Sequence, residues 1–146
     1  MKVRKAKYND ITALVIFCKA QHAETSFRDW AFNPALFRRS LREIIKGQNG
    51  DALIAVSKTG HIRGLLLAWH EQLLWTKQFY ATDLHFVAEQ GGDMLLRAFK
   101  KWAIERNCIE IGIGTFNGKD EERIETLYNR LGFQTVGKTY RMELIG

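Results

Sequence analysis

The hydrophobic pattern changes twice between residues 79 and 115, and this constrains the fold more than any other feature of the chain. Residues 79–88 and 109–115 are β-rich runs. Between them, apolar residues recur at helical spacings of three and four: Met94, Leu95, Ala98, Phe99 and Trp102. The turn Glu89-Gln90-Gly91-Gly92 joins the first strand to this helix. Such a strand–turn–helix–strand unit predicts a mixed sheet covered by helices.

The flanking segments extend this pattern. Two helices are predicted near the start, one from Asn9 or Asp10 to about residue 20, and one opened by Asn33-Pro34 and closed by Gly47. The runs 52–56 and 62–70 read as a strand pair joined by a glycine turn. An apolar stripe at helical spacing, Ile124, Leu127, Tyr128 and Leu131, predicts the last helix.

Residues 134–144 (QTVGKTYRMEL) are predicted to close the chain as one or two antiparallel strands around Gly137-Lys138. The fold class that follows is α/β, of the α+β type. We expect a mixed central sheet of about six to seven strands with helices on both faces. At 146 residues, with one proline and no linker-like stretch, the chain is expected to form one domain over residues 1–146.

The composition limits the expected location of the protein and the partners that it can bind. No apolar run is long enough to span a bilayer, and the first ten residues contain no signal-peptide core, so a cytoplasmic protein without membrane attachment is expected. The two cysteines and four histidines show no metal-binding spacing, so no metal is expected. The net charge of +6 suits an anionic partner, either nucleic acid or a phosphorylated cofactor, or else a solvated basic surface.

The glycine turn before the central helix is the first candidate site. Small residues at a helix N-terminus let backbone N–H groups point at an anion, and the helix dipole favours negative charge there. A pyrophosphate would fit beside Gln90, Gly91 and Gly92. An ordinary tight turn is the alternative, and Asp93 would repel a phosphate.

The run LYNRLGF near the C-terminus carries a more specific signal. A helix with a tyrosine three residues before Leu-Gly-Phe resembles a recurrent signature of the GNAT superfamily of acyl-CoA-dependent N-acyltransferases, matched here by Tyr128, Leu131, Gly132 and Phe133. The order of predicted elements is similar to that family from residue 3 to residue 144.

This resemblance implies a set of roles. The glycine turn would hold the pyrophosphate of acetyl-CoA through Gln90, Gly91 and Gly92, although the family's glycine loop is shortened here. The pantetheine arm would lie between strands 79–88 and 109–115, with Asn117 in contact with it. Tyr128 would protonate the departing thiolate, a chemically reasonable step because a phenol is protonated at neutral pH. A packed aromatic residue is the alternative for Tyr128.

Two groups of candidates remain. Arg97 and Lys100 lie one and two turns into the central helix, where they could reach the CoA phosphates or form a solvated basic face. The base that deprotonates the amine is expected among Asp83 and His85, predicted on one face of strand 79–88 with Asp83 raising the pKa of His85, or is Glu71.

The acceptor side is expected from loop 21–32 and segment 71–78. The candidate wall comprises His22, Glu24, Trp30, Trp69, Trp75 and Phe79. Segment 71–78 is also apolar enough to be a contact between two copies of the chain.

We therefore expect an N-acetyltransferase that moves the acetyl group of acetyl-CoA to a primary amine of a small molecule or peptide, by direct attack in a ternary complex. The alternative function is a catalytically degenerate GNAT-fold protein that acts as a binding or structural component. Nucleic acid is not an expected partner, because the basic clusters at 2–7, 38–42 and 97–106 accompany no recognised nucleic-acid motif.

Overall fold

The computed structural model describes residues 1–114 and 121–145. Their elements are, in chain order, β1 (Lys2–Lys5), the 3-10 turn η1 (Tyr8–Asp10), α1 (Ile11–His22), α2 (Pro34–Lys46), β2 (Gly50–Val56), β3 (Ile62–Gln72), β4 (Phe79–Ala88), α3 (Gly92–Glu105), β5 (Cys108–Gly112) and α4 (Glu121–Arg130). The predicted mixed sheet with helices on both faces is confirmed. Within this part of the chain it has five strands, fewer than the six to seven expected.

The sheet runs in the order β1-β2-β3-β4-β5. The first three strand pairings are antiparallel, and β4 and β5 are parallel, as the intervening helix α3 requires. The β4–β5 pairing extends from Phe79 opposite Cys108 to Thr82 opposite Gly112. Beyond Thr82, β4 continues to Ala88 without β5 beside it. The parallel pair therefore opens at its carboxyl end.

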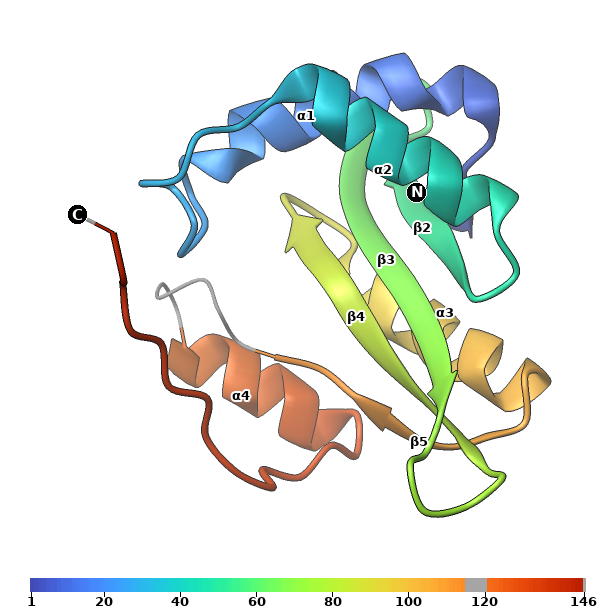
Figure 1. Cartoon of the computed structure of the whole chain (residues 1–146). Coiled ribbons are helices and arrows are strands. Elements are labelled where there is room, and N and C mark those ends of the chain that lie inside the picture. The colour runs from blue at the N-terminus through green and yellow to red at the C-terminus, as the bar shows by residue number, and fades with distance from the viewer. Residues whose placement is uncertain (115–120, 146) are drawn as a thin grey trace.

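Two cores lie on the two faces of the sheet. Leu14, Cys18 and Leu41, from α1 and α2, pack with one set of sheet residues on the first face. Leu95 and Phe99 from α3 pack on the second face, together with Tyr128 from α4. Figure 1 shows the same division, with α1 and α2 above the strands and α3 behind them.

The predicted helix boundaries rest on local chemistry that the structure confirms. The side chain of Asn33 accepts a hydrogen bond of 3.1 Å from the Leu36 amide and so caps α2. Asn107, with φ of 59°, ends α3, and Gly132, with φ of 97°, follows α4.

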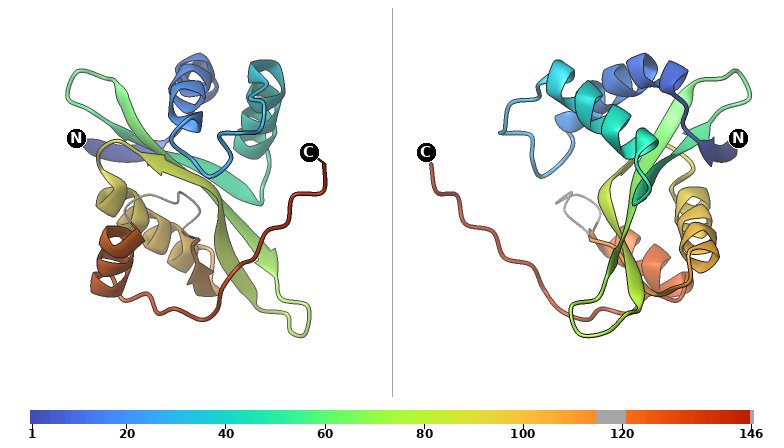
Figure 2. Two further views of the ribbon diagram at one scale, coloured as in Figure 1. Left: turned by 90° about the vertical axis from the view of Figure 1, so that its left-hand side faces the viewer. Right: turned by 45° about the vertical axis from the view of Figure 1, so that its right-hand side comes forward.

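The C-terminal strands are the main correction to the predicted fold. Residues 131–145 contain no strand, and Val136, Tyr140, Met142 and Leu144 are all at least 80% exposed. Alternating polar and apolar residues form a strand only where a partner strand accepts their backbone hydrogen bonds. This segment instead leads away from α4 (Figure 2). β5 is consequently the edge strand of the described sheet.

Candidate functional site

A β-bulge in β4 decides where the predicted catalytic side chains lie. Asp83 pairs with Ala68 of β3 and His85 pairs with Leu67, so Leu84 is one residue more than the partner strand matches. Ala68 belongs to the core beneath α3, and Leu67 to the core beneath α1 and α2. Asp83 and His85 therefore face opposite sides of the sheet, and the prediction that they share a face is wrong.

On the α3 side, Asp83 is joined to Tyr128 through one residue. The Gly114 backbone amide lies close enough to the carboxylate of Asp83 to lower its pKa. The hydroxyl of Tyr128 donates to the Gly114 carbonyl at 3.1 Å. Gly114 lies two residues beyond β5, so this trio sits where β4 and β5 separate. The structure thus brings together two of the three predicted catalytic residues.

Burial determines the protonation states of Tyr128 and Asp83. Desolvation raises the pKa of Tyr128 well above its usual value, and the nearby Asp83 carboxylate raises it further. Burial also raises the pKa of Asp83, against the opposing effect of the Gly114 amide. Tyr128 is therefore a protonated donor throughout the neutral range.

On the opposite side, His85 belongs to a row of aromatic rings. Its ring centroid lies 6.4 Å from that of Phe37, which lies 5.2 Å from Phe32, which in turn lies 5.4 Å from His22. Burial lowers the pKa of His85, and the nearby His22 lowers it further. The expectation that Asp83 would raise the pKa of His85 is thus wrong, because the bulge turns the carboxylate away. A neutral imidazole at pH 7 can accept a proton.

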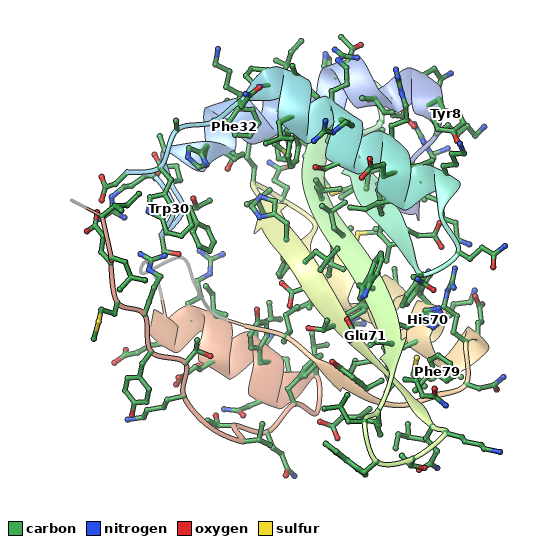
Figure 3. The ribbon with its side chains drawn as sticks, in the orientation of Figure 1. Tyr8, Trp30, Phe32, His70, Glu71 and Phe79 are labelled. Carbon is green, nitrogen blue, oxygen red and sulfur yellow. The ribbon has the colours of Figure 1, made fainter. Side chains whose placement is uncertain are left out.

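The predicted aromatic wall divides between two ends of the molecule. His22 and Trp30 meet where Nε2 of His22 lies 2.6 Å from the Trp30 carbonyl oxygen, and Glu24 is exposed on the same loop. Trp69 (in β3, opposite Thr82), Trp75 (in the turn after β3) and Phe79 (at the start of β4) belong to the β3–β4 hairpin instead. Figure 3 shows Trp30 and Phe32 on one side and His70, Glu71 and Phe79 on the other. Sequence reasoning missed Phe32 and Phe37. In the sequence, Phe37 looks like a core residue of a helix, and Phe32 looks like part of the loop that precedes it.

Glu71 is engaged elsewhere. It accepts hydrogen bonds from Trp69 at 2.9 Å and Tyr80 at 3.4 Å. It lies four residues along β3 from Leu67, the partner of His85, which corresponds to about 13 Å of strand. The structure therefore does not bring Glu71 to the side chain of His85.

The glycine turn has the geometry that a close backbone approach requires. Gly91, at φ of 78°, precedes the first residue of α3, and Gln90 is exposed beside it. A side chain at Gly91 would lie 2.6 Å from the sulfur of Met1 and 3.0 Å from Cβ of Ala55. One side of Gly91 is thus covered by Met1 and by Ala55 of β2, while Asp93 is exposed in the first turn.

A cavity of about 1350 Å³ runs along the outer edge of β5, between α3 and α4. Arg97, Lys100 and Tyr128 line it, together with residues 109–114 of the β5 edge and its continuation. Asp83, His85 and the glycine turn do not line it. Asn117, predicted to contact pantetheine, lies outside the described residues. Among the residues that are described, no cluster of His, Cys, Asp or Glu could hold a metal ion, and no helix is long and apolar enough to cross a membrane.

The chain is similar to known proteins in its fold. No protein-family model matches the chain, and no curated protein matches it in sequence. Solved structures do match it. A probable acetyltransferase superposes with a TM-score of 0.78 at 16% identity, over 100% of this chain and 99% of the other.

A transcriptional regulator from Bacillus halodurans C-125 gives a TM-score of 0.78 at 22% identity, over 98% of this chain and 99% of that one. An aminoglycoside acetyltransferase from an uncultured soil metagenomic sample gives 0.73 at 16% identity, over 99% and 98%. These likenesses cover nearly the full length of each chain. The chain therefore has the GNAT fold, that of the N-acyltransferases which its sequence resembles.

Proposed function

We propose that the chain transfers the acetyl group of acetyl-CoA to a primary amine by direct attack within a ternary complex. One observation carries this proposal: Asp83, Gly114 and Tyr128 are linked at the point where β4 and β5 separate. An extended thioester arm could pair there with the part of β4 that β5 does not cover, and its carbonyl carbon would then lie close to Tyr128. The fold of the structural neighbours supports an acetyltransferase.

The residues of the glycine turn fit the phosphate end of such a co-substrate. Gln90, Gly91 and Gly92 stand at the N-terminus of α3, where amide groups without helical partners and the helix dipole favour an anion. Asn117 is proposed to contact the pantetheine arm. The co-substrate supplies an acetyl group already activated as a thioester, so this chain's residues need to position it and move two protons.

Tyr128 is proposed to handle the first proton. As the amine nitrogen bonds to the acetyl carbon, the carbon–sulfur bond breaks and the sulfur leaves as a thiolate. The Tyr128 phenol gives its proton to that sulfur. This transfer is uphill by itself, because the pKa of the phenol exceeds that of a thiol. The phenolate then takes up the N–H proton that the nitrogen loses after it has bonded to the acetyl carbon, so protons balance overall.

His85 is proposed as the base on the acceptor side. It faces α1, α2 and loop 23–33, from which an amine would approach, and its neutral imidazole accepts the proton that the attacking ammonium must lose. Asp83, on the other face, is proposed to keep the Tyr128 phenol protonated. The acceptor is proposed to be a small-molecule or peptide amine, and the activity cytoplasmic.

A pH profile tests the base. Because burial and His22 lower the pKa of His85, the acidic limb of kcat/KM should fall below the ordinary histidine pKa of about 6.5. Activity is present above that limb and is lost as the imidazole gains a proton. In His85→Gln, kcat/KM at pH 7.5 should fall by about 100-fold or more and the limb should disappear. An unchanged limb in this variant would assign the base elsewhere.

The basic face of α3 offers a second test. Arg97→Gln combined with Lys100→Gln should raise the KM for acetyl-CoA by about 10-fold with little change in kcat, because both are cations on α3, one and two turns beyond the glycine turn, and would attract the CoA phosphates. Lys101→Gln is the matched control, since Lys101 lies on the same helix, is exposed and does not line the cavity beside α4. Equal effects of the double variant and the control would indicate only a general loss of positive charge.

The proposed function itself is tested by incubating the protein with acetyl-CoA and a panel of primary amines. Release of free CoA should depend on the amine, and the product should gain the mass of one acetyl group. Acetyl-CoA binding without transfer to any amine would favour the alternative function, a GNAT-fold binding protein. The exposed Leu74 and Trp75 of the β3–β4 hairpin are then the proposed contact with a second copy.

A further inference from the structure

The loop between α1 and α2 holds a cation that belongs to the distant C-terminal segment. The guanidinium carbon of Arg141 lies 5.2 Å from the ring centroid of Phe27 and 5.6 Å from that of Trp30. Nη2 of Arg141 donates to the Ser26 carbonyl oxygen at 2.9 Å. Figure 1 shows the C-terminal segment rising from α4 toward this loop. A residue 115 positions away in sequence is thus fixed to the loop by three contacts.

The loop is built to hold those rings in place. Thr25, only 3% exposed, donates through its hydroxyl to the His22 carbonyl at 2.9 Å and accepts from the Phe27 amide at 3.2 Å. The Trp30 amide donates to the Phe27 carbonyl at 2.9 Å, and the rings of Phe27 and Trp30 lie 5.3 Å apart. The turn therefore supports a preformed aromatic platform beneath the guanidinium.

The guanidinium keeps most of its hydrogen-bonding capacity. An arginine side chain has five N–H donors, and within residues 1–114 and 121–145 the Ser26 carbonyl is the acceptor that meets Arg141. None of the ion pairs in those residues includes it. A planar cation that is stacked on aromatic rings and exposed on its other side has the arrangement that recognises a carboxylate through two parallel hydrogen bonds.

This cation lies at one end of the aromatic row whose other end is His85. Trp30 contacts His22 through its carbonyl, and the rings of His22, Phe32 and Phe37 lead from there to His85. A molecule lying along this row would meet apolar ring surface in its middle. Its two ends would meet the Arg141 guanidinium and the His85 imidazole.

We propose that Arg141, held by Phe27, Trp30 and Ser26, binds a carboxylate of the acceptor, so that the preferred substrates are amines carrying a carboxylate at a distance set by the aromatic row. This inference rests on the proposed function, because it assigns the attacking amine to the His85 end. It deepens that function by selecting anionic amines over neutral or polycationic ones. A positively charged acceptor group would instead be repelled by Arg141.

Three matched series of acceptors test the proposal: ω-amino acids, n-alkylamines and α,ω-diamines, each with the same range of methylene numbers. For the best length, the KM of the ω-amino acid should be about 10- to 100-fold below that of the alkylamine, as expected for hydrogen bonds to a charged group. The methylene number at the minimum reports the distance from Arg141 to the reacting amine. Preference for the diamines would overturn the proposal and indicate a cation subsite.

Variants of Arg141 and of its platform separate recognition from structure. Arg141→Gln should abolish the preference for the ω-amino acid by raising its KM, with the alkylamine KM unchanged. Arg141→Lys should keep part of the preference, because it retains the charge without the planar pair of donors. Trp30→Ala should weaken the preference by about 2- to 10-fold through loss of the cation–π contact. Arg39→Gln, exposed on α2, is the matched control. A preference unaltered in Arg141→Gln would overturn the proposal.

A binding measurement distinguishes the failure of this proposal from the failure of the proposed function. The ω-amino acids are titrated against the full chain without acetyl-CoA by isothermal calorimetry, for the wild type and for Arg141→Gln. Binding that depends on Arg141 supports the carboxylate site even if no amine is acetylated, in which case only the proposed function fails. Acetylation of alkylamines with no Arg141-dependent binding or preference would leave the proposed function standing and overturn this one.

Discussion

Replacing Tyr128 with phenylalanine should lower kcat by about 100- to 1000-fold, because general acid catalysis is typically worth that much and the phenylalanine ring retains the packing without the proton. The KM for acetyl-CoA should change little. The lost hydrogen bond to Gly114 should cost only about 1 kcal/mol of the free energy of unfolding. Steady-state kinetics and a urea unfolding curve measured on the same preparation separate the two effects.

Tyr8→Phe is the matched control for this experiment. Tyr8 is 56% exposed and does not line the cavity beside α4, so the substitution removes a hydroxyl away from the site, and kcat should stay within about twofold of the wild type, as for most surface changes. If Tyr128→Phe also stays within about twofold, Tyr128 serves only as a packed aromatic residue and the thiolate is protonated by another group.

Phe99→Ala is expected to have the largest effect on stability. Phe99 is completely buried in the core between α3 and the sheet. Removing a buried phenylalanine side chain typically lowers the free energy of unfolding by about 3–5 kcal/mol, through lost burial and the cavity left behind. Because α3 also carries the glycine turn and Arg97, we expect weaker acetyl-CoA binding at temperatures where this variant begins to unfold.

Ile104→Ala on the same helix is the control for Phe99. Its side chain is 62% exposed, and its loss should change the free energy of unfolding by about 0.5 kcal/mol or less. Chemical denaturation of both variants provides the comparison. A loss below about 1 kcal/mol for Phe99→Ala would mean that α3 is not anchored through this ring, since buried residues of this size rarely cost so little.

Most of the fold could be predicted from the sequence because its signals are local. Asn33-Pro34 and Gly47 mark the two ends of α2, and Asn107 marks the end of α3, since each depends on the backbone conformation of a few neighbouring residues. The parallel strand pair around α3 could likewise be expected from the order of the elements. The closing strands could not, because the alternation in residues 134–144 records a strand-forming tendency but not the presence of a partner.

The site was predicted less completely, for two physical reasons. One extra residue, Leu84, reverses the face on which the side chains after it lie, and a bulge leaves no mark in a pattern of alternating residues. The contacts of Arg141 with Phe27 and Trp30 depend on where the C-terminal segment runs, which no local signal specifies. Tyr128 and Asp83 were predicted individually, but their link through Gly114 appears only in three dimensions.

Thermal unfolding in the presence of acetyl-CoA tests the central claim most directly. A ligand at about 100 times its Kd stabilises the folded state by about 2.7 kcal/mol. For a chain of 146 residues this corresponds to a rise in Tm of about 5–10 °C. We predict such a rise, increasing with acetyl-CoA concentration as expected for one site. A Tm that stays unchanged up to millimolar acetyl-CoA would contradict the claim that this chain is an acetyl-CoA-dependent transferase.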